Sequence, residues 1–170
     1  MIKTNIKKSL IAAIFSAITI GVLTFLTYET NYGMFLIASF GSSMVLLYGY
    51  PENQFAQPKN IFFGHVLTAT VGVVCLHVIP FSEYIVINIF SYSFEIAKLV
   101  MTIPFAVGLG VGLMILLNVT HPPAGGNPII VIIGGVSWNY LLNPIITGSI
   151  VILAFGIVLN RLILKKKYPL

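Results

Sequence analysis

Four long apolar runs constrain this chain more than any other feature of its sequence. They cover residues 9–27, 60–79, 97–118 and 143–164, and charged residues are almost absent from them. A helix of about 20 apolar residues crosses the hydrocarbon core of a bilayer. Only 8% of the 170 residues are charged and 58% are hydrophobic, whereas about a quarter of the residues in a soluble domain are charged. The sequence therefore predicts an all-α, polytopic transmembrane helix bundle.

Two shorter apolar runs lie between the long ones, at residues 33–50 and 124–140. Each contains glycine or follows proline, and the segment 81–96, which carries glutamates and several aromatic residues, reads as a connector. The chain is then one membrane domain of about six segments, with halves at 9–80 and 97–165. Paired short, glycine- or proline-interrupted segments are typical of transporters built from repeats.

An offset of 84 residues aligns three pairs of glycines between these halves. They are Gly41 with Gly125, Gly64 with Gly148, and Gly72 with Gly156. Three crossings in each half would make a 3+3 inverted repeat. The alternative is that the short runs enter the membrane and return on the same side, which would give four crossings and a parallel repeat.

Basic residues cluster outside the first and last apolar runs. Lys7 and Lys8 precede the first run, and Lys165 to Lys167 follow the last. The positive-inside rule predicts that both ends are cytoplasmic in a multi-pass protein of the cell membrane, with the first run retained as a helix. The basic residues are not interleaved with aromatics, which argues against a nucleic-acid partner. The single Cys75 excludes an internal disulfide and reads as apolar filling.

The polar stretch at residues 118–128 (NVTHPPAGGNP) is the strongest candidate for a site. The two prolines predict that the preceding helix ends near Thr120 or His121. Asn127 before Pro128 fits an N-cap, so that the new helix would offer free backbone N–H groups to a small anion. His121 can donate to an anion, relay a proton or cap the preceding carbonyls, and it is considered together with Asn118. Gly125 and Gly126 allow either ligand approach or close helix packing.

The first half offers a second set of candidates. Gly41, Ser42 and Ser43 lie in the short run, Asn60 precedes His65 in the next long run, and Lys59 stands at its entrance. Ionisable groups in membrane segments are costly and commonly functional, which singles out His65, although a satisfied structural histidine is the alternative. Serine hydroxyls that bond back to their own helix are the alternative for Ser42 and Ser43. Lys59 either attracts anions or anchors the helix at the head groups.

No enzyme signature accompanies these residues. The chain contains no Asp, no histidine pattern with metal-ligand spacing and no phosphate-binding glycine loop. We therefore expect neither an enzyme nor a bound cofactor or metal. A membrane enzyme that uses the histidines would need one of the four glutamates, all outside the long apolar runs, to fold back against them.

The motif at residues 121–126 (HPPAGG) resembles the signature of the HPP family of integral membrane proteins. A second block, from residues 38–43 (ASFGSS) through Pro51 to residues 56–60 (AQPKN) and 64–65 (GH), is similar to the other well-marked block of that family. The resemblance implies a small membrane protein, commonly described with four spans, and plant and cyanobacterial relatives are implicated in nitrite transport. The resemblance departs from the family pattern at Gly126, where alanine is frequent.

Together these features favour a transporter or channel for nitrite or a similar small monovalent anion. In this hypothesis Gly41, Ser42 and Ser43 face Gly125, Gly126 and Asn127, while His65 and His121 donate hydrogen bonds or carry a proton. The alternative from another class is a non-transporting assembly or interaction protein of the membrane. The bilayer and the anion are the expected partners, and the glycine faces of the helices would also suit subunit contacts in a homo-oligomer. The sequence does not choose between channel and carrier, or between nitrite, nitrate and formate.

Overall fold

The computed structural model describes residues 6–30, 34–78 and 94–169, and side chains from residue 99 onward in the last of these ranges. This described part is all-helical, with six α-helices joined by short 3-10 and π-helical turns. Four helical stretches are long and apolar enough to cross a membrane: Ile6–Glu29, Pro58–His77, Leu99–Leu116 and Trp138–Ile163. The predicted fold class and the four long spans are confirmed. Most of the predicted connector 81–96 lies outside the described residues, and residues 94–96 begin the next helix.

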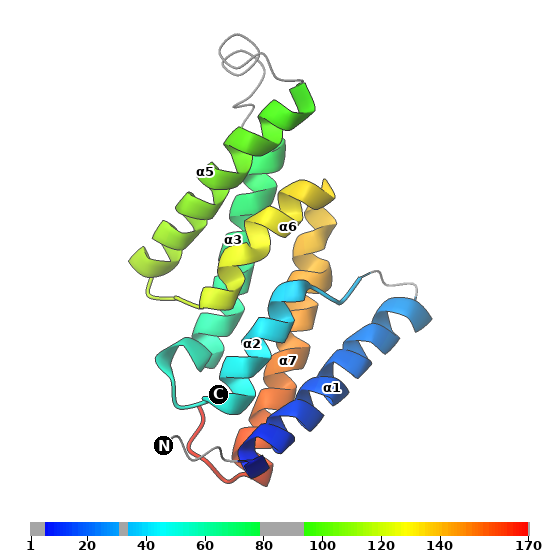
Figure 1. Ribbon diagram of the computed structural model, residues 1–170, viewed down its shortest axis with the longest axis vertical. Helices are drawn as coiled ribbons and strands as arrows, with labels where there is room; N and C mark the ends of the chain where they lie inside the picture. Colours follow the sequence, from blue (N-terminus) through cyan, green and yellow to red (C-terminus); the bar gives the residue numbers. More distant parts are fainter. Residues whose placement is uncertain (1–5, 31–33, 79–93, 170) are drawn as a thin grey trace.

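Successive helices alternate in direction along the bundle (Figure 1). α1 (Ile6–Glu29) rises, α2 (Ala38–Gly49) descends and α3 (Pro58–His77) rises again. α5 (Phe94–Leu116) descends, α6 (Asn127–Gly134) rises, and α7 (Thr147–Ile157) descends into the turn η5 (Val158–Ile163). The start of α1 and the end of η5 therefore lie at the same end of the bundle.

The two short apolar runs form short helices. At about 1.5 Å per residue, the 12 residues of α2 reach only about 18 Å and the 8 residues of α6 about 12 Å, against about 30 Å of hydrocarbon core. The run 124–140 is interrupted at Gly135, whose φ of +55° ends α6. It then continues as the turn η3 (Trp138–Leu141) and the π-helical turn η4 (Leu142–Ile146).

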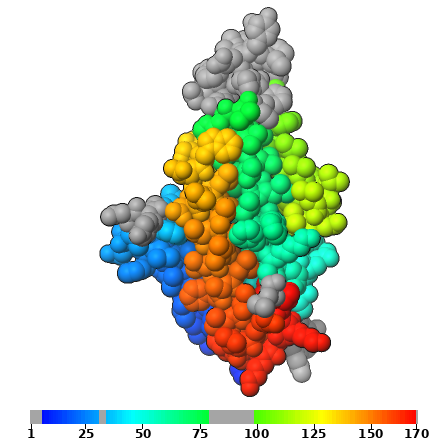
Figure 2. Space-filling model, turned by 180° about the vertical axis from the view of Figure 1, so that it is seen from behind, coloured from blue at the N-terminus to red at the C-terminus, as the bar shows by residue number. Residues whose placement is uncertain are grey.

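The main core lies where α2 packs against α7. Phe40, Met44 and Leu47 of α2 share one buried cluster with Ile145 and Ile152, which lie in η4 and α7. Figure 2 shows α7 running down the back of the molecule between α1 and α3. Thr19 and Leu23 are the buried residues of the long outer helix α1. Such a small share is expected for a helix that faces lipid on most sides.

Two predictions about the stretch 118–128 are wrong. α5 ends at Leu116 rather than near Thr120, because Asn118 adopts a left-handed φ of +53° and the N–H of Val119 donates to the carbonyl of Met114. Asn127 is not an N-cap: the 3-10 turn η2 (Pro122–Gly126) runs directly into α6, and the N–H of Asn127 donates to the carbonyl of Ala124. The free backbone N–H groups expected at Asn127 are thus not available there.

Candidate functional site

A buried polar cluster joins α2, α3 and the start of α6. Ser39 and Ser43 come from α2, His65 and Thr68 from α3, and Asn127 from α6, while His121 lies in the connection before η2. All six side chains are buried, and none is more than 6% exposed. We call this group the central cluster.

The first turn of α2 and the first residue of α6 meet in this cluster. The hydroxyl of Ser39 donates to Oδ1 of Asn127 at 2.7 Å. The two short helices run in opposite directions away from this point (Figure 1). The amino-terminal end of α2, where the helix dipole is positive, therefore meets the junction of η2 and α6 inside the bundle.

The amide of Asn127 is fixed in one orientation by its partners. Its Oδ1 accepts from Ser39, and its Nδ2 donates to the backbone carbonyl of His65 at 3.2 Å and to Oγ1 of Thr68 at 3.0 Å. Nδ2 also lies 3.1 Å from Nδ1 of His65. Because an amide nitrogen can only donate, these partners assign Nδ1 of His65 as an acceptor and place the proton of the neutral ring on Nε2.

Ser43 connects the two histidines. Its Oγ lies 2.9 Å from Nε2 of His65 and 2.7 Å from Nε2 of His121. Nδ1 of His121 donates to the backbone carbonyl of Phe55 at 2.7 Å, so Nε2 of a neutral His121 is an acceptor. The hydrogen bonds therefore run from His65 to Ser43, from Ser43 to His121 and from His121 to Phe55.

The hydroxyl of Ser43 also has a second acceptor, the carbonyl of Ser39 at 3.0 Å. If His121 takes up a proton on Nε2, the hydroxyl can turn its hydrogen to Ser39 and accept from both histidines. The cluster can thus hold one extra proton through a single hydroxyl rotation. The rings of His65 and His121 lie with their centres 5.1 Å apart, a separation at which two positive charges would repel each other strongly.

Two backbone features bring His121 against α3. Pro122 keeps the residue before it, His121, in an extended conformation with φ −135°. The tight turn η2 begins directly after it, at Pro122. Gly64 provides the space, because a Cβ at this position would lie 2.8 Å from Cβ of His121. A larger residue than glycine at position 64 would push His121 away from Ser43.

The connection between α2 and α3 closes the cluster at one end. It contains the 3-10 turn η1 (Gln54–Ala56), which supplies the Phe55 carbonyl. Nδ2 of Asn60 donates to the carbonyls of Gln54 and Thr120, which ties η1 to the residue before His121. The hydroxyl of Tyr168 donates to the carbonyl of Ala56 at 2.6 Å, so the end of the chain also holds η1 in place.

The structure brings together some of the sequence-predicted site residues. His65, His121, Ser43 and Asn127 belong to the central cluster, and Asn60 borders it. Gly41, Ser42, Asn118 and Lys59 are exposed in the isolated chain. Gly125 and Gly126 are half-buried; a Cβ at Gly125 would make ordinary contacts with Val111 and Met114, and one at Gly126 would meet nothing within 4 Å. Close packing therefore does not account for either glycine.

Sequence reasoning missed two members of the cluster and one acceptor. Ser39 lies four residues before Ser43, and Thr68 lies three residues after His65, spacings that place each pair on one helix face. That periodicity would have found both. The Phe55 carbonyl carries no sequence signal, because every residue has such a group.

His121 makes the stability of the protein dependent on pH. It lies in the connection after α5, outside the four long apolar helices, and burial lowers its pKa to about 4 although the bond to the Phe55 carbonyl acts in the opposite direction. The unfolded chain, with an ordinary histidine pKa of about 6.5, binds more protons between these values. The free energy of unfolding should therefore decrease as the pH falls from about 6.5 to about 4, by up to about 3 kcal/mol from this group.

Thermal unfolding of the detergent-solubilised protein between pH 7.5 and pH 4 measures this effect. The background from carboxylates is small, since the chain has four glutamates and no aspartate. His121→Asn should reduce the pH dependence in this window without abolishing it, because His65 is a second fully buried histidine. A wild-type melting temperature that stays constant from pH 6.5 to pH 4 would contradict the assignment of a neutral, buried His121.

Comparison with known proteins places this architecture among membrane proteins. A family model described as the HPP transmembrane region matches residues 1–169. Two proteins of Dictyostelium discoideum, each named a transmembrane protein, are 32% identical over 79% of this chain and 29% identical over 91% of it. The chain spans 44% and 48% of the length of these relatives. No solved structure matches the chain.

Proposed function

Since this chain belongs to the HPP transmembrane family, and is a multi-pass membrane protein, we propose that it translocates a small monovalent anion, with nitrite as the first candidate. The observation that carries the proposal is the central cluster. Buried polar and ionisable groups inside a membrane bundle are costly and commonly mark a substrate or proton pathway. Short helices that begin at such a point are typical of transporter sites.

In this proposal the anion binds to side-chain donors. Ser39, Ser43, His65, His121 and Asn127 supply hydroxyl, imidazole and amide donors, and the positive end of α2 favours negative charge without a fixed cation. The backbone N–H groups expected at Asn127 contribute little, because η2 uses them. Without a fixed cation the site can release the anion as readily as it binds it.

In the structure the donors of the central cluster bond to protein acceptors, so the site is closed. The segment that closes it at one end is η1, a three-residue turn whose Phe55 carbonyl accepts from His121 and which Asn60 and Tyr168 hold in place. Displacement of η1 would free the Nδ1 proton of His121 toward the end of the bundle where Lys59 is exposed at the start of α3. The proposal assigns η1 as the gate and Lys59 as the entrance charge.

We further propose that the protein lies in the plasma membrane and that both ends of the chain are cytoplasmic. The start of α1 and the end of η5 lie together (Figure 1), and basic residues flank both. This arrangement is what the positive-inside rule favours for a cytoplasmic face.

We also propose that the chain consists of two halves with the same architecture in inverted orientation. An offset of 84 carries α2 onto residues 122–133, which form η2 and α6, and α3 onto residues 142–161, which form η4, α7 and part of η5. A Cβ at Gly64 would contact Ala124, and one at Gly148 would contact Phe40, 84 positions before Ala124.

A second pair of contacts follows the same rule. A Cβ at Gly72 would contact Val131, and one at Gly156 would contact Leu47, 84 positions before Val131. Each close approach of α3 to the second half thus has a counterpart between α7 and α2. The opposite directions of α3 and α7 in Figure 1 support an inverted rather than a parallel repeat. Inverted halves around a central polar site suit alternating access.

Flux into proteoliposomes tests the proposal. Purified protein should take up nitrite, with formate and nitrate as competitors, and an effect of an inward proton gradient would identify proton coupling through the histidines. Absence of flux for all three anions, with the protein folded and inserted, would contradict transport and favour the non-transporting assembly protein.

Ser43→Ala provides a sharper test of the central cluster. It removes the hydroxyl between the two histidines and should reduce nitrite uptake about tenfold or more, because a buried group that loses its partner costs about 1–3 kcal/mol. Ser149→Ala is the matched control, since Ser149 is also fully buried but its Oγ has no hydrogen-bond partner. Equal uptake by the two variants would remove Ser43 from the pathway.

A further inference from the structure

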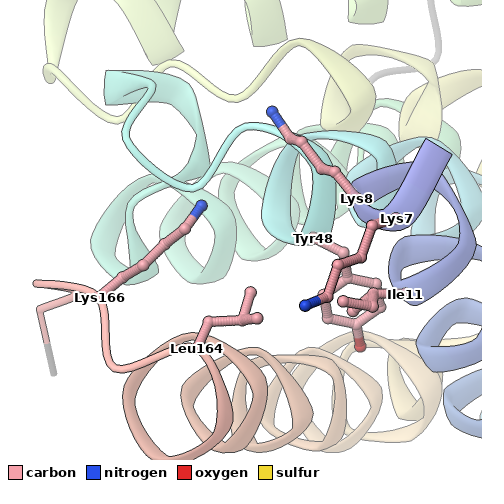
Figure 3. Close-up of a pocket in the computed structure, with 6 residues that line it drawn as sticks. All are labelled: Lys7, Lys8, Ile11, Tyr48, Leu164 and Lys166. Carbon is pink, nitrogen blue, oxygen red and sulfur yellow. The ribbon is translucent and has the colours of Figure 1, made fainter. Parts of the chain in front are cut away.

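Three lysines from opposite ends of the sequence surround one pocket. Lys7 and Lys8 lie in the first turn of α1, and Lys166 follows η5. The cavity has a volume of about 200 Å³ and is open to the outside, and Ile11, Tyr48 and Leu164 complete its lining. In Figure 3, Leu164 lies between Lys166 and Lys7, and Ile11 and Tyr48 lie beside Lys7. We call it the lysine pocket.

The pocket lies at the end of the bundle where the basic residues gather. Arg161, Lys165 and Lys167 are exposed nearby in sequence, and Glu29 lies at the far end of α1. Glu52 does approach the pocket, with an oxygen 3.8 Å from Nζ of Lys166. This pair is 69% and 40% exposed, and ion pairs that are so exposed contribute little, so a stronger anion can replace the glutamate.

The walls of the pocket combine two chemistries. The lysine ammonium groups suit an anion with several hydrogen-bond acceptors, such as a phosphate group. Nζ of Lys8 lies 4.3 Å from the centre of the Tyr50 ring, and this cation–π contact restrains the Lys8 side chain. The floor is apolar: the ring of Tyr48 is 2% exposed and its hydroxyl is bound to Thr19 on the inner side. An apolar surface does not stabilise a free phosphate ion. It can contact the glycerol and the first methylene groups of a lipid.

We propose that the lysine pocket binds the phosphate headgroup of an anionic phospholipid. Juxtamembrane lysine clusters attract anionic lipids on the cytoplasmic leaflet, and here the cluster is folded into a cavity instead of lying on an extended tail. The bound lipid would link the first turn of α1 to the segment after η5. This proposal is independent of the anion-transport proposal, because none of the pocket residues belongs to the central cluster.

Binding of phosphatidylglycerol to the purified, delipidated full chain tests the proposal. Native mass spectrometry and thermal unfolding would compare phosphatidylglycerol, phosphatidylcholine and inorganic phosphate as probes. The wild type should retain and be stabilised by phosphatidylglycerol only. The variant Lys7→Gln/Lys8→Gln/Lys166→Gln should lose this affinity, by about fivefold for each lysine removed.

The matched control is Arg161→Gln/Lys165→Gln/Lys167→Gln, which removes the same number of charges outside the pocket. It should lose clearly less affinity than the pocket variant, because its three side chains do not line the cavity. Equal losses in both triple variants would overturn the proposal in favour of general charge attraction. Stabilisation by inorganic phosphate equal to that by phosphatidylglycerol would overturn the assignment to a lipid.

Discussion

Replacing His121 with asparagine should nearly abolish nitrite uptake while the protein stays folded. Asparagine can still donate to the Phe55 carbonyl, as Nδ1 of His121 does, but it is too short to replace Nε2 at Ser43. The hydrogen-bonded connection from His65 through Ser43 to residue 121 is then broken, and the group that can take up a proton is removed. A loss of at least tenfold is expected, since buried polar contacts of this kind are worth about 1–3 kcal/mol.

Three variants separate the roles of His121. His121→Asn keeps the tie to η1, His121→Gln reaches Ser43 without an ionisable ring, and His121→Ala removes both contacts. If the imidazole only holds η1, asparagine should transport like the wild type. If it carries a proton, asparagine and glutamine should both lose the response to an inward proton gradient. Uptake by His121→Ala at the wild-type rate, with normal expression, would exclude His121 from the pathway.

His77 is a useful comparison in the same assay. It lies at the far end of α3, with Nε2 2.7 Å from the carbonyl of Val136 and its ring stacked on Trp138. Both contacts attach the end of α3 to the turn after α6, outside the central cluster. His77→Asn should therefore leave nitrite uptake close to that of the wild type, so that any loss seen for His121→Asn reports the site rather than the removal of a histidine.

The long helices were predictable because crossing a membrane imposes a composition on about 20 consecutive residues. The runs 9–27 and 60–79 correspond to α1 and α3, and this holds whatever packs against them. The exact end of α5 was not predictable in the same way. It depends on Asn118 taking a left-handed conformation, which a single residue decides and which composition does not record.

The central cluster was predictable only in part, for a different reason. His65 and His121 stand out because an ionisable group in an apolar segment is expensive wherever it lies. Which neighbour on a helix faces them depends on the rotation of that helix. Ser43 points inward and Ser42 does not, although the two are adjacent and chemically identical. That choice is made by the packing of α2 against α7, which only the fold reveals.

Gly64→Ala should lower both the stability of the protein and its transport activity. The new Cβ would lie 2.8 Å from Cβ of His121 and 3.1 Å from the carbonyl oxygen of Val119. Neither atom is at the end of a flexible side chain, so η2 and the connection before it must move away from α3. Overpacking of this kind costs about 1–3 kcal/mol, and the same displacement separates His121 from Ser43. Both the melting temperature and nitrite uptake should therefore fall.

Gly112→Ala is the matched control for this prediction. Gly112 also lies within a long helix, α5, but a Cβ there would meet nothing within 4 Å. Alanine should stabilise the helix by about 0.5–1 kcal/mol, because glycine loses more backbone entropy on folding. If Gly64→Ala is as stable as Gly112→Ala, α3 does not approach His121 as closely as described. If Gly64→Ala loses stability but transports normally, the contact is real and the position of His121 does not limit transport.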